Sequence, residues 1–418
     1  MKKIISTFLF VTLICMLCVP LTSCESKKES KTENSEVTTL YVYNWGEYIS
    51  DGSEGTLDVN TMFEEWYFET YGQKIKVNYS TYSSNESMYA KISSGSVNYD
   101  VIVPSDYMIE RMIKEDLIAP LDYDNIPNAQ NILPEFQNAE YDPDKNADGY
   151  NDYSVPYLYG MIGIIYNTTM VDEADTGSWD LMWNEKYAGN ILQFNNSRDA
   201  FGSAQYSMGD VNLVNSDSEE DWRRALEKLK EQKPILQGYV MDEIYNKMEN
   251  GSAAIAAYYA GDFMAMYENN NDLEFFYPEE GTNLYVDAMC IPKSSQNKLI
   301  AERYINYMLS EEPAVANAEY TYYASPNRVV RDNEEYIEYM NEIKEGGYDL
   351  MYDTDAIPTS SYRNLSGEKL LLINTLWEEL KSDITVSAGI YVLCGVIIGT
   401  LVCLGIFFAV RKKKRNIY

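Results

Sequence analysis

The sequence predicts an α/β protein built on parallel β-sheet, and two observations support this. Short β-rich segments alternate with segments of helical spacing: a strand at 40–43, a helix at 60–71, a strand at 76–79, a helix over 88–92 and a buried strand at 101–103. This β-α-β-α-β order is typical of a parallel sheet with helices on its faces. The second observation is length, since the chain between its two apolar ends is long enough for two domains.

The remainder of this central part continues the alternation of strands and helices and contains no internal repeat. Further strands are expected at 160–166, 190–194, 252–259 and 285–291. Further helices are expected at 219–231, 241–250, 298–310 and 366–383.

The N-terminal segment has the features of an export signal. Two lysines precede an uncharged run over 4–23, which predicts a lipoprotein signal peptide at 1–23. The run ends Leu-Thr-Ser-Cys, which resembles the lipobox of bacterial lipoproteins, and this predicts that Cys24 is lipidated. A plain secretory signal with a chance cysteine is the alternative. The polar residues that follow predict a flexible tether at 24–37, because they cannot bury enough apolar surface to offset their ordering entropy.

The C-terminal segment predicts a membrane span. Residues 384–410 carry no charge and exceed the roughly 20 residues that a spanning helix needs. Five basic residues follow at once, which predicts a basic cytoplasmic tail at 411–418. The alternative is a buried core helix. The fold expected from the sequence therefore includes a C-terminal transmembrane helix. The protein is expected to be lipid-anchored and single-pass, with its central part on the outer face of the cytoplasmic membrane, on the periplasmic or cell-surface side.

Composition excludes several functional classes. The chain has 65 acidic and 33 basic residues, a net charge of −32, which argues against nucleic acid as a partner and favours a cationic ligand. It has no histidine, and Cys290 is the single cysteine between the two terminal segments, so neither a disulfide there nor a zinc cluster is expected. No catalytic or phosphate-binding motif is present. The sequence predicts that the protein is not an enzyme and has no cofactor.

The residues that follow the predicted strands are rich in carboxylates and aromatic rings. They lie at 44–48, 105–107, 195–199, 259–262 and 286–287. Ligands of open parallel sheets bind beyond the carboxyl ends of the strands, so these side chains are expected to meet. Carboxylates neutralise ammonium groups, and ring faces attract cations and cover methylene stems. The pattern therefore predicts a site for a flexible diammonium or triammonium ligand.

The same segments resemble the spermidine/putrescine-binding proteins of bacterial ABC importers, over about residues 40–381 and in the same order. The motifs that carry the resemblance are Tyr-Asn-Trp-Gly-Glu-Tyr at 43–48, Tyr-Ser-Thr-Tyr-Ser-Ser-Asn-Glu at 79–86, Val-Pro-Ser-Asp-Tyr at 103–107, Ser-Val-Pro-Tyr-Leu-Tyr-Gly at 154–160, Ser-Pro-Asn at 325–327, and the region around 363–364.

The resemblance implies a two-lobed fold of the periplasmic-binding-protein type (type II), with the ligand in a cleft between α/β lobes. Lobe 1 is expected at 38–153, completed by a segment after about 288. Lobe 2 is expected at 154–287, completed by C-terminal helices to about 383. The chain is expected to cross between the lobes near 153–157 and 286–292.

The implied function is extracytoplasmic binding of putrescine or spermidine and delivery to an ABC permease and its ATPase. Two alternatives remain open at this point. One is a membrane-anchored polyamine sensor ectodomain, although the short tail holds no signalling module. The other is a same-fold receptor for another small cationic ligand.

The resemblance also assigns roles to individual residues. It places aromatic residues at 259 and 285 on either side of the ligand's alkyl chain. It places a carboxylate at 287 on an ammonium group, a second at 262 as in the putrescine-type members, and a third at 199 at the far end of the cleft. The ligand-binding residues carried over by position are Trp45, Tyr48, Ser105, Tyr107, Asp199, Tyr259, Asp262, Tyr285, Asp287 and Tyr323.

Two departures from the family pattern concern the choice of polyamine. Asn196 stands where spermidine-type members have an aspartate, and Arg363 stands where they have a glutamine near the ligand. A cation facing the cleft would repel a third ammonium group, so the sequence favours putrescine over spermidine. Arg363 could instead pair with Asp199 or point outward.

A weaker pattern suggests calcium. Asp144, Asn146, Asp148 and Asp152 stand at positions 1, 3, 5 and 9 of an EF-hand-like loop with glycine at position 6. Position 12 is Val155, so the bidentate glutamate is missing. An ordinary acidic turn is the favoured interpretation, and the calcium site is the alternative.

Overall fold

The structure is a computed structural model that describes residues 37–382. Its strands form one mixed sheet in the order β2-β1-β3-β9-β4-β7-β5-β6, with β10 paired to β9 and β8 paired to β4. The strands are β1 (Thr38–Trp45), β2 (Ile75–Tyr82), β3 (Val101–Ile102), β4 (Ser154–Asn167), β5 (Ile191–Phe194), β6 (Leu236–Val240), β7 (Ile255–Tyr259), β8 (Leu273–Phe276), β9 (Thr282–Cys290) and β10 (Thr359–Ser360).

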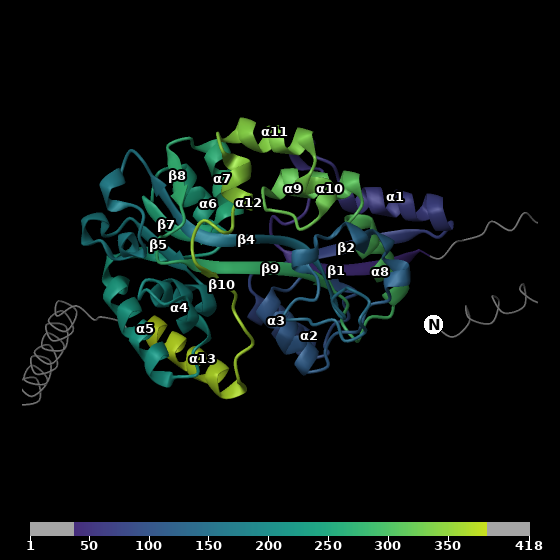
Figure 1. Ribbon diagram of the computed structural model, residues 1–418, viewed down its shortest axis with the longest axis horizontal. Helices are drawn as coiled ribbons and strands as arrows, with labels where there is room; N and C mark the ends of the chain where they lie inside the picture. The colour runs from purple at the N-terminus through teal and green to yellow at the C-terminus, as the bar shows by residue number, and fades with distance from the viewer. Residues whose placement is uncertain (1–36, 383–418) are drawn as a thin grey trace, which may run out of the picture. The chain divides into compact units, whose positions relative to one another are not determined.

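Helices cover both faces of this sheet (Figure 1). In that view α1, α6, α7, α9 and α11 lie on one side of the strands, and α2, α3, α4, α5 and α13 lie on the other. The helices are α1 (Val59–Tyr71), α2 (Asn85–Ser93), α3 (Asp106–Lys114), α4 (Ser197–Tyr206), α5 (Glu219–Gln232), α6 (Glu243–Glu249), α7 (Ala260–Asn269), α8 (Lys298–Met308), α9 (Glu311–Thr321), α10 (Arg328–Arg331), α11 (Glu334–Ile343), α12 (Gly347–Tyr352) and α13 (Gly367–Ser382).

Two long antiparallel strands, β4 and β9, connect the two halves of the sheet. They pair with each other from Ser154↔Cys290 to Met161↔Leu284. One end of β9 also pairs with β3, while the later part of β4 pairs with β7 and β8. We call the half around β1, β2 and β3 the first lobe, and the half around β5, β6, β7 and β8 the second lobe. The expected two-lobed α/β fold is confirmed.

Parallel pairing within each lobe brings several strand ends together. In the first lobe β1 pairs in parallel with both β2 and β3, and in the second lobe β5 pairs in parallel with both β6 and β7. The helices α3, α4 and α7 begin within four residues of the ends of β3, β5 and β7, respectively. Each turn from strand to helix therefore points its side chains toward the gap between the lobes.

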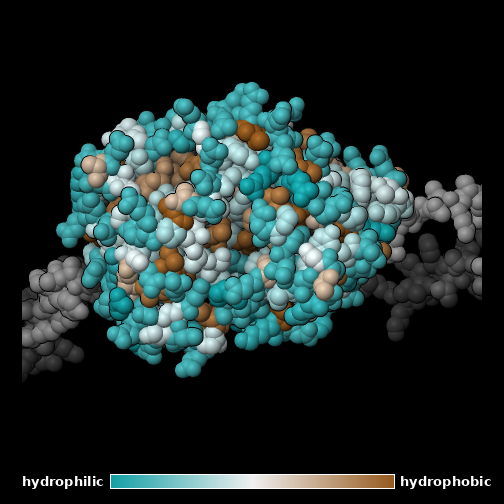
Figure 2. All heavy atoms as spheres, viewed as in Figure 1, coloured by the Kyte–Doolittle hydropathy of each residue, from teal (hydrophilic) through white to brown (hydrophobic). Residues whose placement is uncertain are grey.

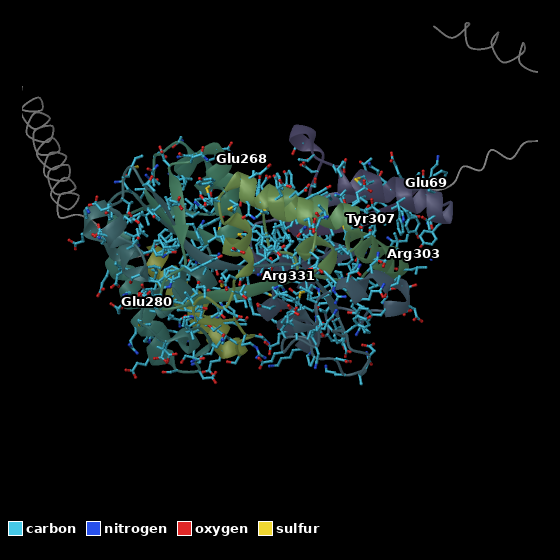
Figure 3. The ribbon with its side chains drawn as sticks, turned by 45° about the horizontal axis from the view of Figure 1, so that its top comes forward. Glu69, Glu268, Glu280, Arg303, Tyr307 and Arg331 are labelled. Carbon is cyan, nitrogen blue, oxygen red and sulfur yellow. The ribbon has the colours of Figure 1, made fainter. Side chains whose placement is uncertain are left out.

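The C-terminal third of the chain returns to both lobes. Helix α8 packs beside α1: Arg303 donates to the Tyr67 hydroxyl at 2.9 Å, and Tyr307 lies 5.0 Å from the Trp66 ring. Figure 3 shows Arg303 and Tyr307 close to the helix that carries Glu69. Helix α13 instead packs on α5 and α4 in the second lobe. Residues 38–382 belong to one compact unit, so the lobe boundaries expected at 153/154 and 287/288 stay a prediction.

The expected fold needs one correction. It included a C-terminal transmembrane helix, but in the stretch from 37 to 382 no helix is long and apolar enough to cross a membrane, and the membrane helix is not upheld as part of the fold. The segment predicted to span, 384–410, lies outside the described residues, as does the tail at 411–418. The signal peptide at 1–23, Cys24 and almost all of the tether at 24–37 also lie outside them.

Candidate ligand-binding site

A single pocket at the gap between the lobes brings the predicted site residues together. All ten residues expected to contact the ligand, from Trp45 in the first lobe to Asp262 in the second, line this pocket. Their contact with a ligand stays a prediction. Around the pocket, most of the face shown in Figure 2 is hydrophilic, with hydrophobic residues in small separate patches. Hydrophilic residues cover so much of this face that they do not mark the site, and the case for a ligand depends on the carboxylates inside the pocket.

Asp287 is held by hydroxyl groups of the first lobe. It lies on the connecting strand β9 and is almost fully buried, with 5% of its surface exposed. The Tyr48 hydroxyl donates to one carboxylate oxygen at 2.8 Å, and the Ser105 hydroxyl donates to the other at 2.5 Å. Burial raises the pKa of Asp287 to about 6, because desolvation disfavours the charged form. A cationic ligand beside it would favour the ionised form and lower this pKa again.

Asp262 occupies the second lobe at the first turn of α7 and is only partly buried. The Tyr245 hydroxyl donates to it at 2.5 Å, and the Tyr323 hydroxyl donates to its other oxygen. Burial raises its pKa to about 6, in part opposed by these two hydrogen bonds. Asp262 thus resembles Asp287 in chemistry, although its supporting groups come from different elements.

Asp199 is the third predicted carboxylate, and Asn196 orients it. The Asn196 side chain caps α4 by accepting from the Asp199 backbone N–H at 2.9 Å, and its amide donates to the Asp199 carboxylate at 2.7 Å. The Tyr259 hydroxyl donates to the same oxygen at 2.6 Å. Burial raises the pKa of Asp199. Asn196, treated from the sequence as a lost acid, therefore acts here as a partner of the remaining acid.

Aromatic rings form the walls between these carboxylates. Tyr259 and Tyr285 lie 5.5 Å apart in an edge-to-face arrangement, and Tyr48 and Tyr323 lie 5.1 Å apart in the same arrangement. The Trp45 indole N–H donates to the Val103 carbonyl at 3.0 Å, which fixes the plane of that ring. Such rings offer apolar faces to a methylene chain and a negative potential to a cation.

Glycines make room for two of the pocket tyrosines. A β-carbon at Gly160 would lie 2.7 Å from the Tyr285 hydroxyl oxygen, and one at Gly202 would lie 2.1 Å from that of Tyr362. Both distances are shorter than a non-bonded contact allows. The positions of these rings therefore depend on residues behind them, in β4 and α4.

Four carboxylates that line the pocket were not among the residues assigned to the ligand from the sequence: Glu47, Glu86, Asp106 and Asp242. Glu86 lies in the first turn of α2 and accepts from the Tyr107 hydroxyl at 2.9 Å. Asp106 opens α3, and burial raises its pKa to about 8. Glu86 and Asp106 both stand inside quoted family motifs, at 79–86 and 103–107, so motif membership was the signal that could have found them.

A buried arginine in the pocket wall was missed as well. Arg198 is 5% exposed, and its guanidinium lies 4.4 Å from the Tyr362 ring and 5.5 Å from the Tyr107 ring. Its Nη1 donates to the Val214 carbonyl at 3.3 Å, while Nε and Nη2 have no hydrogen-bond partner within residues 37–382. Its place in the segment 195–199, directly after a predicted strand, was the signal that could have found it.

Arg363 does not line the pocket. It forms a two-pronged ion pair with Glu110, with Nε at 3.0 Å and Nη2 at 3.2 Å from the two carboxylate oxygens, and a further contact with Glu140. The neighbouring Tyr362 is the residue that faces the pocket. The preference for putrescine over spermidine therefore loses the premise that a cation at position 363 faces the ligand. The alternative that Arg363 pairs with Asp199 is also wrong, because its partners are Glu110 and Glu140.

The predicted calcium loop forms hydrogen bonds within itself. Asp144 accepts from the Gly149 N–H at 2.8 Å, and Asp152 accepts from the Asn146 side-chain amide at 2.8 Å. The backbone hydrogen bond from Gly149 lowers the pKa of Asp144. Across the described residues no group of three or more acidic or cysteine side chains could hold a metal ion. The geometry is that of the acidic turn that the sequence favoured, and calcium binding there stays a prediction.

The pocket is suited to binding rather than to bond cleavage. The carboxylates of Asp199, Asp262 and Asp287 are each engaged by hydroxyl donors, which fix their orientation and leave lone pairs to accept further hydrogen bonds from a cation. No described residue is a histidine, and the buried Cys290 does not line the pocket. What the arrangement offers is several spaced negative groups separated by apolar rings.

Comparison with known proteins also indicates a binding protein. Residues 61–343 match the family described as bacterial extracellular solute-binding proteins. The spermidine/putrescine-binding periplasmic protein of Escherichia coli (strain K12) is 31% identical over 294 residues, which is 70% of this chain and 79% of that protein.

Two solved structures are also similar. A Listeria monocytogenes protein, provisionally named as a spermidine/putrescine ABC transporter, has a TM-score of 0.71 and 32% identity, covering 82% of this chain and 99% of that one. The spermidine/putrescine ABC transporter substrate-binding protein PotD of Streptococcus pneumoniae has a TM-score of 0.64 and 34% identity, covering 82% and 98%. The chain therefore belongs to the bacterial extracellular solute-binding proteins, and it is a binding protein rather than an enzyme.

Proposed function

We propose that this protein binds a polyamine, putrescine or spermidine, outside the cytoplasm and delivers it to an ABC importer. The observation that carries this proposal is the set of three carboxylates, Asp199, Asp262 and Asp287, each held by tyrosine hydroxyls in one pocket with aromatic walls. The spacing of negative groups by ring faces suits a chain of methylenes with ammonium ends. Relatives named for spermidine and putrescine support the same ligand class.

The direct test is calorimetric titration of the protein with putrescine, spermidine and spermine, with a neutral diol of matched length as control. The proposal expects saturable binding of at least one polyamine and none of the diol, because the carboxylates contribute only when they face a cation. Tight binding of a different cation with no polyamine binding would instead identify a same-fold receptor for that cation. Absence of any cation binding would refute the proposal.

We further propose that the protein is held to the membrane by a lipid on Cys24. The support is the Leu-Thr-Ser-Cys motif at the end of a signal-like segment, together with membership of an extracellular family. Mass spectrometry of the N-terminal peptide from the native protein tests this. A diacylglyceryl mass on Cys24 is expected, and an unmodified cysteine there, or a mature N-terminus elsewhere, would contradict it. The Cys24→Ala variant should lack the added mass.

A further inference from the structure

Arg363 joins the two lobes at a place away from the ligand pocket. Its segment is tied to the second lobe: the Arg363 backbone N–H donates to the Asn215 side chain at 2.8 Å, and the Asn215 amide donates to the Ser361 carbonyl at 2.8 Å. Its guanidinium reaches Glu110 on α3 of the first lobe. Figure 1 shows the segment that leads from β10 to α13 passing beside α3.

The contact is built from both backbone and side chain. Besides the two-pronged ion pair, the Asn364 backbone N–H donates to Glu110 at 2.9 Å, so one carboxylate accepts from two consecutive residues. Glu110 and Arg363 are 27% and 31% exposed, respectively, whereas Glu140, the second acid on Arg363, is 83% exposed. The Glu110 contact is the partly desolvated one, and two-pronged arginine–carboxylate pairs are among the stronger and more directional ion pairs.

We propose that Arg363 is a positioning residue that stabilises the joined arrangement of the lobes through Glu110, and so sets the affinity of the pocket without touching the ligand. A pocket lined from both lobes is complete only when the lobes are joined. Apparent affinity is proportional to the fraction of molecules in the binding-competent arrangement, so a contact that raises this fraction raises the affinity for every ligand alike. The affinity part of this inference rests on the proposed polyamine function, whereas the contact between the lobes does not.

Hydrogen–deuterium exchange on the full chain tests the contact without any ligand. Arg363→Gln and Glu110→Gln should each increase exchange in peptides covering 106–114 and 359–366, and the effect of the double variant should be smaller than the sum of the two single effects because the two side chains share one ion pair. Arg223→Gln is the matched control, since Arg223 pairs with Glu219 at 2.7 Å within α5 alone. Unchanged exchange at both peptides in Arg363→Gln would overturn the inference.

Polyamine titrations of the same variants separate positioning from a direct charge effect. Arg363→Gln should weaken putrescine and spermidine by the same factor, roughly five- to tenfold, with Arg363→Lys partly restoring affinity and the control unchanged. A selective gain in spermidine affinity would show that Arg363 acts on the ligand's charge, and would overturn the proposal. If the parent protein binds no polyamine, the proposed function fails, and the exchange measurement alone decides on the contact.

Discussion

The Tyr323 ring lies directly over Gly261: a β-carbon on residue 261 would lie 2.4 Å from the ring. Gly261→Ala should therefore displace Tyr323 and break its hydrogen bond to Asp262. We expect polyamine affinity to fall by about tenfold, because the displaced Tyr323 would no longer hold the Asp262 carboxylate in the orientation that faces a ligand. Gly238→Ala is the control, because no atom lies within 4 Å of a β-carbon built there. Equal calorimetric affinities for the two variants would contradict this.

Replacement of Asp287 should weaken binding directly. Asp287→Asn keeps the shape of the side chain and removes the charge that would face an ammonium group, so we expect a loss of about tenfold to a hundredfold. The exposed Asp124 offers a control, Asp124→Asn, that changes the net charge equally. Titration of both variants with the preferred polyamine measures the difference. An unchanged affinity for Asp287→Asn would remove this residue from the binding site.

Ligand affinity should depend on pH in the range where the pocket acids titrate. The pKa values of Asp262 and Asp287 are both raised to about 6, so below that pH the ligand-free pocket carries protons that a cation must displace. Amines titrate near pH 10, and the ligand's own charge stays constant. We expect affinity to fall between pH 7.5 and pH 5. Asp287→Asn should reduce this dependence, and a flat profile in the parent protein would contradict the prediction.

Stability of the ligand-free protein should vary with pH through Asp106. Folding raises its pKa from 3.8 to about 8, so the folded protein holds this proton more tightly than the unfolded chain does. The stabilisation is complete below about pH 4 and is lost as the pH rises toward 8. Asp106→Asn has no such dependence, and we expect it to be more stable than the parent at pH 8, by roughly 2–5 kcal/mol. Urea unfolding at pH 5.5 and pH 8 measures this. An equal pH dependence in both proteins would argue against a protonated Asp106.

Much of the site follows from the order of strands and helices. The rule that parallel strands place their carboxyl ends at one edge was enough to bring the segments after β1, β3, β5 and β7 to one pocket. The family resemblance then selected the individual side chains. Helix α4 escaped prediction for a physical reason: Arg198 to Tyr206 are all buried, so the segment shows no alternation of polar and apolar faces.

The direction of single side chains was the least predictable feature. Tyr362 faces the pocket and Arg363 faces Glu110, although they are neighbours in the sequence. In an extended segment adjacent side chains point to opposite sides, and a shift of one residue in the expected alignment exchanges the two. Arg198 was missed for a related reason, because nothing in a sequence separates a buried cation from an exposed one on the same helix.

The donors around Asp287 and Asp199 have a consequence for the order of events in binding. Tyr48 and Ser105, which hold Asp287, belong to the first lobe, and Asn196 and Tyr259, which hold Asp199, belong to the second. Because the donors of each carboxylate come from one lobe, a separation of the lobes would leave two half-sites, each with its hydrogen bonds intact. A polyamine can dock on either half-site first and meet the other already formed. We therefore expect capture to need rigid-body movement of the lobes rather than rebuilding of either half-site, and the release rate to follow how often the lobes part.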